Sequence, residues 1–278
     1  MKLSANHFFN AQQKCLTLLG MSGVGKTHLA KLLSEQDAYF HYSGDYRISA
    51  QYLNNDILEN VINRVKQDDW LKSLLENESI RIQNNITFDN LSSASAFLGK
   101  VGNPELGGLP IGEFTRRQAL HKKAEIKTML DVPSFIAKAK QQGMSNFIND
   151  AGGSLCELDD ENVYQVLSEH TIILYIRASQ DNEQTLIKRA QTHPKPLYYQ
   201  THFLQEQLAI YLAENQFSYV AQINPDAFVR WIFPRLLEHR KPKYEQIAKQ
   251  YGCTIDSEDL YQCRHANEAL ELIAGAMS

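Results

Sequence analysis

One stretch near the N-terminus combines glycines with a lysine and a hydroxyl side chain, in a spacing suited to binding phosphate: Gly20-Met21-Ser22-Gly23-Val24-Gly25-Lys26-Thr27. It fits G-x-x-x-x-G-K-[ST], in which successive backbone N–H groups surround an anion. Lys26 would reach the β- and γ-phosphates of a nucleotide, and the Thr27 hydroxyl would bind Mg²⁺. The stretch, called the phosphate-binding loop below, therefore predicts a site for ATP and Mg²⁺. The predicted nucleotide-binding residues are Gly20, Ser22, Gly23, Val24, Gly25, Lys26, Thr27 and His28.

Two carboxylates lie where apolar segments end, downstream of this loop. Asp45 follows an aromatic run at residues 38–42, and Asp150 follows Phe147-Ile148. Polar groups at the carboxyl ends of parallel strands converge on a ligand. Asp45 could take the proton of a substrate hydroxyl or bind substrate, and Asp150 could hold Mg²⁺ or polarise an attacking group. The structural alternatives are an Asx-turn at Asp45 and a capping role for Asp150, which stands just before Gly152-Gly153.

Phosphoryl transfer also needs cations around the γ-phosphate, and one basic cluster follows the clearest predicted strand. Lys188, Arg189 and Lys195 belong to a segment with two prolines, at about 180–200. Such a segment could close as a lid and supply an arginine. A solvated helix face is the alternative, and for Arg189 we prefer the functional interpretation.

A second basic cluster lies on a predicted helix that begins near Glu113. It contains Arg116 and Arg117 followed by Lys122 and Lys123. Arg117 could bind an anionic substrate. A solvated helix face is again the alternative, and it is the preferred interpretation for the two lysines.

Bulk composition narrows the classes of function. The chain of 278 residues has a net charge of −4 and a pI of about 6.1, which argues against a nucleic-acid-binding surface. No apolar run is long enough to span a bilayer, and the first residues lack the apolar core of a signal peptide. The four cysteines are not spaced like zinc ligands and predict reduced thiols in a cytoplasmic protein.

Strands that alternate with helices would position these side chains. The run TIILYIR at 171–177 is continuously apolar, which is typical of a parallel strand covered on both faces. The fold class predicted is α/β, with three layers and a mostly parallel five-stranded sheet between helices. Strands are predicted at 15–19, 38–42, 144–150, 171–177 and 218–223. Helices are predicted at 27–34, 51–79, 114–129, 133–142, 160–168, 180–191, 201–215, 225–239, 242–250 and 265–277.

The stretch between the second and third predicted strands is long. It holds three of the predicted helices and an irregular part at about 80–112 that is rich in turn formers. No linker composition marks a domain boundary. We therefore expect a single domain over residues 1–278, with a helical insert at about 51–142.

Taken in order, these pieces resemble P-loop NTPases and, among them, small-molecule kinases of the shikimate kinase type. The family has three glycines after strand three, to which Ala151-Gly152-Gly153-Ser154 is similar. Its lid arginine precedes a proline-containing turn, as Arg189 precedes Lys195-Pro196-Leu197. Its late motif R-x-P-x-Y-x-x-[IV]-A resembles RKPKYEQIA at 240–248. The chain departs at Ser43, which replaces the first acid of the family's D-x-D, so that only Asp45 matches.

The resemblance implies transfer of the ATP γ-phosphate to a small, hydroxyl-bearing and possibly anionic molecule. Because Ser43 replaces an acid, Mg²⁺ would depend on Thr27 and Asp150. The absence of an N-K-x-D motif favours adenine over guanine. Two alternatives stay open: a regulatory ATPase whose insert binds a protein partner, and a chain that binds nucleotide without chemistry. The residues implied for the acceptor are Asp45, Arg117, Gly152, Gly153 and Arg240, and those implied for catalysis are Lys26, Asp45, Asp150 and Arg189.

Overall fold

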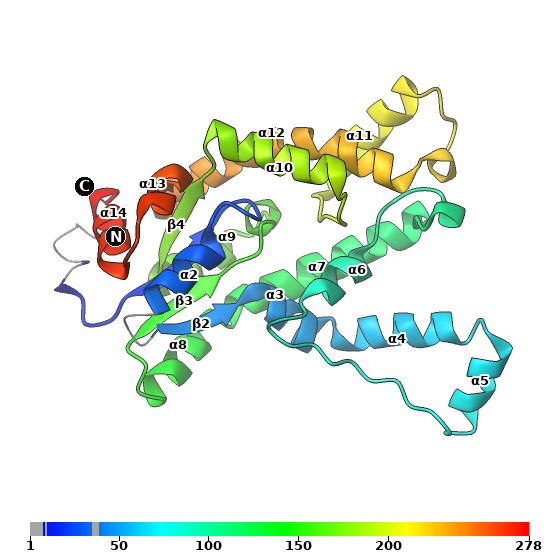
Figure 1. Ribbon diagram of the computed structural model, residues 1–278, viewed down its shortest axis with the longest axis horizontal. Helices are drawn as coiled ribbons and strands as arrows, with labels where there is room; N and C mark the ends of the chain where they lie inside the picture. The colour runs from blue at the N-terminus through cyan, green and yellow to red at the C-terminus, as the bar shows by residue number, and fades with distance from the viewer. Residues whose placement is uncertain (1–7, 9, 35–38, 278) are drawn as a thin grey trace.

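The computed structural model describes residue 8, residues 10–34 and residues 39–277. At its centre lies a five-stranded sheet in the order β2-β3-β1-β4-β5, and every neighbouring pair is parallel (Figure 1). This confirms the predicted α/β class. Residue 38, which the prediction assigned to the second strand, lies outside the described residues. The strands are β1 (Cys15–Leu19), β2 (Tyr39–Ser43), β3 (Asn146–Asp150), β4 (Ile172–Arg177) and β5 (Gly252–Asp256).

Helices cover both faces of this sheet. On one face α2 packs on β2 and β3, and α14 packs on α2 and β5. On the other face α8, α9 and α12 pack on β3, β4 and β5. A parallel sheet needs this double cover because each strand is apolar on both sides. The helices on the sheet are α2 (Lys26–Ser34), α8 (Val132–Gln141), α9 (Glu161–His170), α12 (Pro225–Tyr251) and α14 (Ala266–Gly275).

The remaining helices lie around the carboxyl edge of the sheet or beyond it. The short helix α3 follows β2 directly, and a π-helical segment, Ile48–Tyr52, continues it. Figure 1 shows α4 and α5 extending away from the sheet as an arm. In the described part of the chain, no helix is both long and apolar enough to cross a membrane. These helices are α3 (Gly44–Arg47), α4 (Asn54–Val65), α5 (Asp69–Glu76), α6 (Ser92–Leu98), α7 (Ile111–Leu130), α10 (Gln180–Thr192), α11 (Thr201–Glu214) and α13 (Ser257–Gln262).

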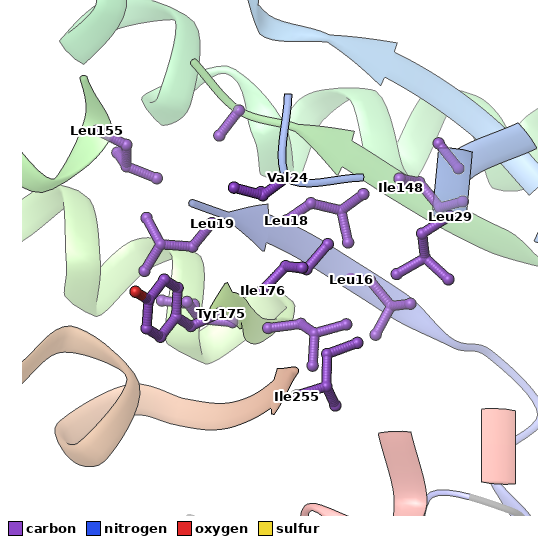
Figure 2. Close-up of a cluster of buried hydrophobic side chains, with 14 of the residues drawn as sticks. Leu16, Leu18, Leu19, Val24, Leu29, Ile148, Leu155, Tyr175, Ile176 and Ile255 are labelled. Atoms are coloured by element: carbon purple, nitrogen blue, oxygen red, sulfur yellow. The ribbon is translucent and has the colours of Figure 1, made fainter. Parts of the chain in front are cut away.

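The central strand β1 carries the main hydrophobic core. Leu16, Leu18 and Leu19 are fully buried, and Figure 2 shows them among side chains from both neighbouring strands and from α2. Removing this much apolar surface from water fixes β1 and the start of α2 relative to each other. The loop between them is therefore held between two rigid elements.

The fifth strand is not where the sequence pattern placed it. Residues 218–223 were predicted as a strand, but Val220–Gln222 form a 3₁₀ turn and β5 is Gly252–Asp256. The Gln222 side chain accepts hydrogen bonds from the backbone N–H groups of Ser218 and Tyr219. These local bonds take donors that a sheet ladder would need, so the turn competes successfully with a strand.

The helices depart from the prediction most at two places, and α3, α6 and α13 were not predicted. Residues 225–239 and 242–250 were predicted as separate helices, but they form α12, a single 27-residue helix that contains Pro234 and Pro242. Apolar residues on both sides of each proline are buried, and this packing keeps the helix continuous in spite of the lost N–H donors. The helix predicted at 51–79 is instead divided, and Asp68 begins α5 by accepting bonds from the backbone of Trp70 and Leu71.

Candidate functional site

The phosphate-binding loop leaves β1 at Leu19 and enters α2 at Lys26. Gly23 and Gly25 have φ angles of 98° and 110°, a region that side chains other than glycine rarely adopt. The N-terminal end of α2 adds the partial positive charge of its unpaired N–H groups. The loop therefore has the backbone form that a phosphate site requires.

Lys26 lies at the base of the loop and is only 7% exposed. Its Nζ donates to the carbonyl oxygens of Gly20 and Met21, at 2.8 and 3.1 Å. Burial lowers the pKa of this amine, while the negative charges of Asp150 and Asp45 oppose the shift. The amine is thus held beside the loop. A bound phosphate group could replace the two carbonyls as the acceptor of its hydrogen bonds.

Thr27 and Asp150 meet across the end of the sheet. The Thr27 hydroxyl donates to Asp150 Oδ2 at 3.0 Å, and His41 Nε2 lies 3.8 Å from the same oxygen. Burial opposes ionisation of Asp150, but the nearby His41, the charge of Lys26 and the Thr27 hydroxyl outweigh it and lower the pKa of the carboxyl. A hydroxyl beside an ionised carboxylate suits Mg²⁺, which binds oxygen ligands.

This pair would supply only part of a metal's coordination shell. Across the described residues, no group of three or more His, Cys, Asp or Glu side chains is arranged to hold a metal ion. Mg²⁺ typically keeps waters and substrate phosphates beside one or two protein ligands. The residues present therefore fit Mg²⁺ bound together with a nucleotide.

A pocket of about 260 Å³, called the loop pocket below, brings most of the predicted residues together. Gly20 and Val24 are exceptions: Gly20 packs against the Ile176 carbonyl, and Val24 is buried in the core (Figure 2). The loop pocket is lined by Ser22, Gly23, Gly25, Lys26, Thr27, His28, Asp45, Asp150, Ala151, Gly152, Gly153 and Tyr261.

Asp45 projects into the loop pocket from the first turn of α3. Ser43 caps this helix by accepting a bond from the Tyr46 N–H, so the residue that replaces an acid has a structural role. Loss of hydration within the pocket raises the pKa of Asp45, Asp150 adds to the shift and Lys26 opposes it. A carboxylate with a raised pKa accepts a proton more readily than a free aspartate.

Arg189 lies on α10 beside the loop. With Ser22, His193 and Lys195 it lines a smaller pocket of about 80 Å³, called the lid pocket below. A Cβ placed on Gly23 would stand 3.5 Å from Arg189 Nη1, which shows how close the guanidinium comes to the loop. The predicted lid residues Arg189 and Lys195 thus border the phosphate-binding loop while remaining exposed.

Arg117 does not line the loop pocket. Its side chain is buried on α7, where Nε donates to Glu113 at 2.6 Å and Nη1 donates to the Phe97 carbonyl at 2.6 Å. The guanidinium also lies over the Phe97 ring. The prediction placed Arg117 on an anionic substrate, whereas the structure gives it an ion pair within α7 and a hydrogen bond that joins α7 to α6.

Arg240 is near the loop but is held by protein partners. Its Nε donates to the buried Glu157 at 2.7 Å, and Nη2 donates to the Tyr198 carbonyl at 2.9 Å. One turn along α12, the Tyr244 hydroxyl donates to the Gly153 carbonyl. The motif at 240–248 therefore helps to hold the Gly152-Gly153 segment in place.

Sequence reasoning missed a buried polar group on α7. Glu125 is fully buried and accepts a bond from the Ser154 hydroxyl at 2.6 Å, while His121 Nδ1 lies 3.7 Å from the same oxygen. Burial raises the pKa of Glu125 to about 7 and lowers that of His121 to about 4. The i,i+4 spacing of His121 and Glu125 was the available signal.

Tyr261 was also missed, because nothing in its spacing indicates a ligand. Its ring stacks on His28 with centroids 5.5 Å apart, and its hydroxyl lies 3.5 Å from the Gly23 carbonyl. The ring is 51% exposed at the edge of the loop pocket. An exposed aromatic face there could stack on a planar base.

No family model and no curated protein matches the chain. Among solved structures it is similar to shikimate kinase from Bacteroides thetaiotaomicron, with 12% identity, a TM-score of 0.45 and coverage of 93% of this chain and 94% of that one. It is also similar to a sugar kinase from Janibacter sp. HTCC2649, with 13% identity, a TM-score of 0.34 and coverage of 96% and 98%. Likenesses of this size do not bear on the activity of the chain.

Proposed function

We propose that this protein binds ATP with Mg²⁺ and transfers the γ-phosphate to a hydroxyl group of a small molecule. The observation that carries the proposal is the contact between Thr27 and Asp150, 3.0 Å apart beside the buried Lys26. Asp45 faces the same pocket. A metal-binding pair, a cation for phosphate and a second carboxylate thus share one pocket, which is the set of groups that phosphoryl transfer uses.

Each residue has a defined task in this proposal. Loop amides and Lys26 hold the phosphates, and the exposed Tyr261 ring, which stacks on His28, contacts the base. Bound Mg²⁺, held by Thr27 and Asp150, would neutralise charge on the phosphates. The acceptor oxygen forms a bond to the γ-phosphorus, the bond from that phosphorus to the ADP oxygen breaks, and the acceptor proton passes to Asp45.

Arg189 completes the proposed set from the lid side. Its guanidinium borders Gly23 and is exposed, so it can reach the γ-phosphate without breaking an ion pair among the described residues. A cation there stabilises the negative charge of the transferring phosphoryl.

The test is acceptor-stimulated release of ADP by the purified chain, with Lys26→Ala as the control. We expect the variant to lose at least about 100-fold in rate, because a donor to the charged phosphates is removed. ADP release that is the same in Lys26→Ala and wild type, or that responds to no metabolite, would overturn the kinase proposal.

A second candidate keeps the nucleotide site and changes its output. No residue of α5 is buried, and Trp70 on this helix is 69% exposed, which favours a protein contact for the arm. In this candidate the chain is a slow ATPase switch that acts through a protein partner. Slow ADP release that a purified protein partner changes, with no effect of metabolites, would support the switch over the kinase.

A further inference from the structure

We infer that the acceptor is a neutral polyhydroxylated molecule and not an anion, because Asp45 and Glu125 make the acceptor end of the loop pocket acidic. This inference rests on the proposed kinase function and names the substrate class of the same site. Two observations carry it: the charges that line the pocket, and the position of Glu125 behind Gly152.

The loop pocket has few cations to offer an acceptor. Of the described residues that line it, Lys26 is the one lysine or arginine, and it belongs to the phosphates. The arginines predicted to hold an anionic group are both in ion pairs: Arg117 with Glu113, and Arg240, whose Nη1 would stand 3.7 Å from a Cβ on Gly153, with Glu157. Arg189 lines the lid pocket instead, on the side of Ser22 where a lid would cover the phosphates. An anionic acceptor would therefore find no free guanidinium in the loop pocket.

Two carboxylates are directed at the same place, Asp45 in the lining of the pocket and Glu125 behind that lining. A Cβ placed on Gly152 would stand 2.8 Å from Glu125 Oε1 and 3.5 Å from Asp45 Oδ1. Asp45 lines the pocket from one side, and Glu125 lies behind the Gly152 backbone. Because position 152 has no side chain, only backbone separates the Glu125 carboxyl from the pocket.

The Glu125 carboxyl is also incompletely satisfied. Its Oε2 accepts from Ser154, but Oε1, the oxygen that faces Gly152, is buried without a hydrogen-bond partner. His121, the nearest basic side chain, has a lowered pKa and stays neutral, and Arg240 is the neighbouring cation that favours the ionised form of Glu125. Above pH 7, where a carboxyl with a pKa of about 7 is ionised, Glu125 repels an anionic ligand, whereas hydroxyl groups donate to carboxylates. The arrangement thus selects hydroxyl groups and rejects acids.

The experiment measures ADP release at pH 8, above the pKa of Glu125, by the wild-type chain with ATP, Mg²⁺ and paired acceptors of similar size. Neutral members are glucose, ribose, sorbitol, ribitol and inositol, and acidic members are gluconate, glucuronate and ribonate. We expect stimulation by one or more neutral compounds, and kcat/KM at least about 10-fold lower for the matched acid. Stimulation by acids above their neutral partners overturns the inference and leaves the kinase function standing. Stimulation by none of the compounds overturns the inference, and the kinase function falls with it when no other metabolite stimulates ADP release either.

The variant Glu125→Gln then tests the residue itself. It keeps size and the acceptor for Ser154 but removes the charge, so we expect the ratio of neutral to acidic kcat/KM to fall about 10-fold. Glu169→Gln, an exposed change at the far end of α9, is the matched control and leaves the ratio unchanged. An unchanged ratio in Glu125→Gln, with ATP-analogue affinity intact, contradicts a role for Glu125. A loss of selectivity explained by misfolding would also change analogue affinity, and the wild-type panel still decides the acceptor class.

Discussion

At the scale of single residues, Asp150 is the group on which the metal argument depends. It receives a hydrogen bond from Thr27 and lies 3.8 Å from His41, and both neighbours favour its ionised form. A carboxylate held ionised at the end of β3 is ready to bind a cation without first losing a proton. Its effect on nucleotide binding should therefore appear when Mg²⁺ is present.

We expect Asp150→Asn to remove most of the benefit of Mg²⁺ while sparing metal-free binding. The amide keeps the size of the side chain but not its charge, so ADP production should fall at least about 100-fold. Calorimetric titration with an ATP analogue, in Mg²⁺ and in EDTA, measures this. We expect the variant to bind the analogue with an affinity similar to wild type in EDTA, and we expect Mg²⁺ not to increase that affinity. A variant with the wild-type response to Mg²⁺ would show that Asp150 is not a metal ligand.

Tyr261 should contribute to nucleotide affinity through its ring. Stacking of a base on an aromatic side chain is worth about 1–3 kcal/mol. Tyr261→Ala should therefore weaken binding of a fluorescent ATP analogue roughly 10-fold, and Tyr261→Phe should keep nearly all of the affinity. Tyr219→Ala, at another exposed tyrosine, is the control. Equal affinity in Tyr261→Ala and Tyr219→Ala would rule out stacking on Tyr261.

The sequence revealed the site residues of the phosphate-binding loop and of the strand ends and missed two that lie inside helices, Glu125 and Tyr261. Asp150 ends β3, and Lys26 follows the loop after β1, so position along the chain implies position in the pocket. Glu125 is part of a buried polar stripe on α7, whose opposite face is polar as well. Amphipathic spacing cannot show which of two polar faces turns inward, so the burial of Glu125 depended on contacts made only in the folded chain.

At the scale of elements, tertiary contacts determined which segment forms the fifth strand, which the local sequence pattern did not show. Residues 218–223 have strand-forming side chains, but Gln222 satisfies their backbone locally. The segment that becomes β5 is short and begins with glycine, so its pattern is weak. It forms a strand because α12 places it beside β4, whose backbone at the edge of the sheet supplies hydrogen-bond partners.

Gly252 should be intolerant of any side chain. A Cβ there would stand 1.8 Å from the Ile173 carbonyl oxygen, so β5 would have to move away from β4. We expect Gly252→Ala to lower the free energy of unfolding by more than about 2 kcal/mol. Gly112→Ala on α7, where a Cβ meets nothing within 4 Å, should raise it by up to about 1 kcal/mol. Urea unfolding compares them, and a Gly252→Ala as stable as wild type would contradict this account of the β4–β5 edge.

At the scale of the whole molecule, the site imposes a dependence of stability on pH. Glu125 is buried among Asp45, Glu157, His121 and Arg240, and its pKa is raised to about 7 from the model-compound value of 4.5. Between these two values the folded chain binds more protons at this group than the unfolded chain does. The contribution of protonated Glu125 to the free energy of unfolding is therefore fully present below pH 4.5 and is lost as the pH rises through 7.

Glu125→Gln should remove this loss, because glutamine stays neutral at every pH. A shift from 4.5 to about 7 corresponds to roughly 3 kcal/mol at pH above 8, since each pKa unit is worth about 1.4 kcal/mol. We expect the variant to exceed wild type in free energy of unfolding by a few kcal/mol at pH 8, and the gap to shrink as the pH falls to 5. Urea unfolding of both proteins across this range isolates Glu125, because all other titrating groups are common to the two chains. A gap that does not change with pH would mean that Glu125 is not charged in the folded protein at pH 8, and the acidic end of the loop pocket would then be Asp45 alone.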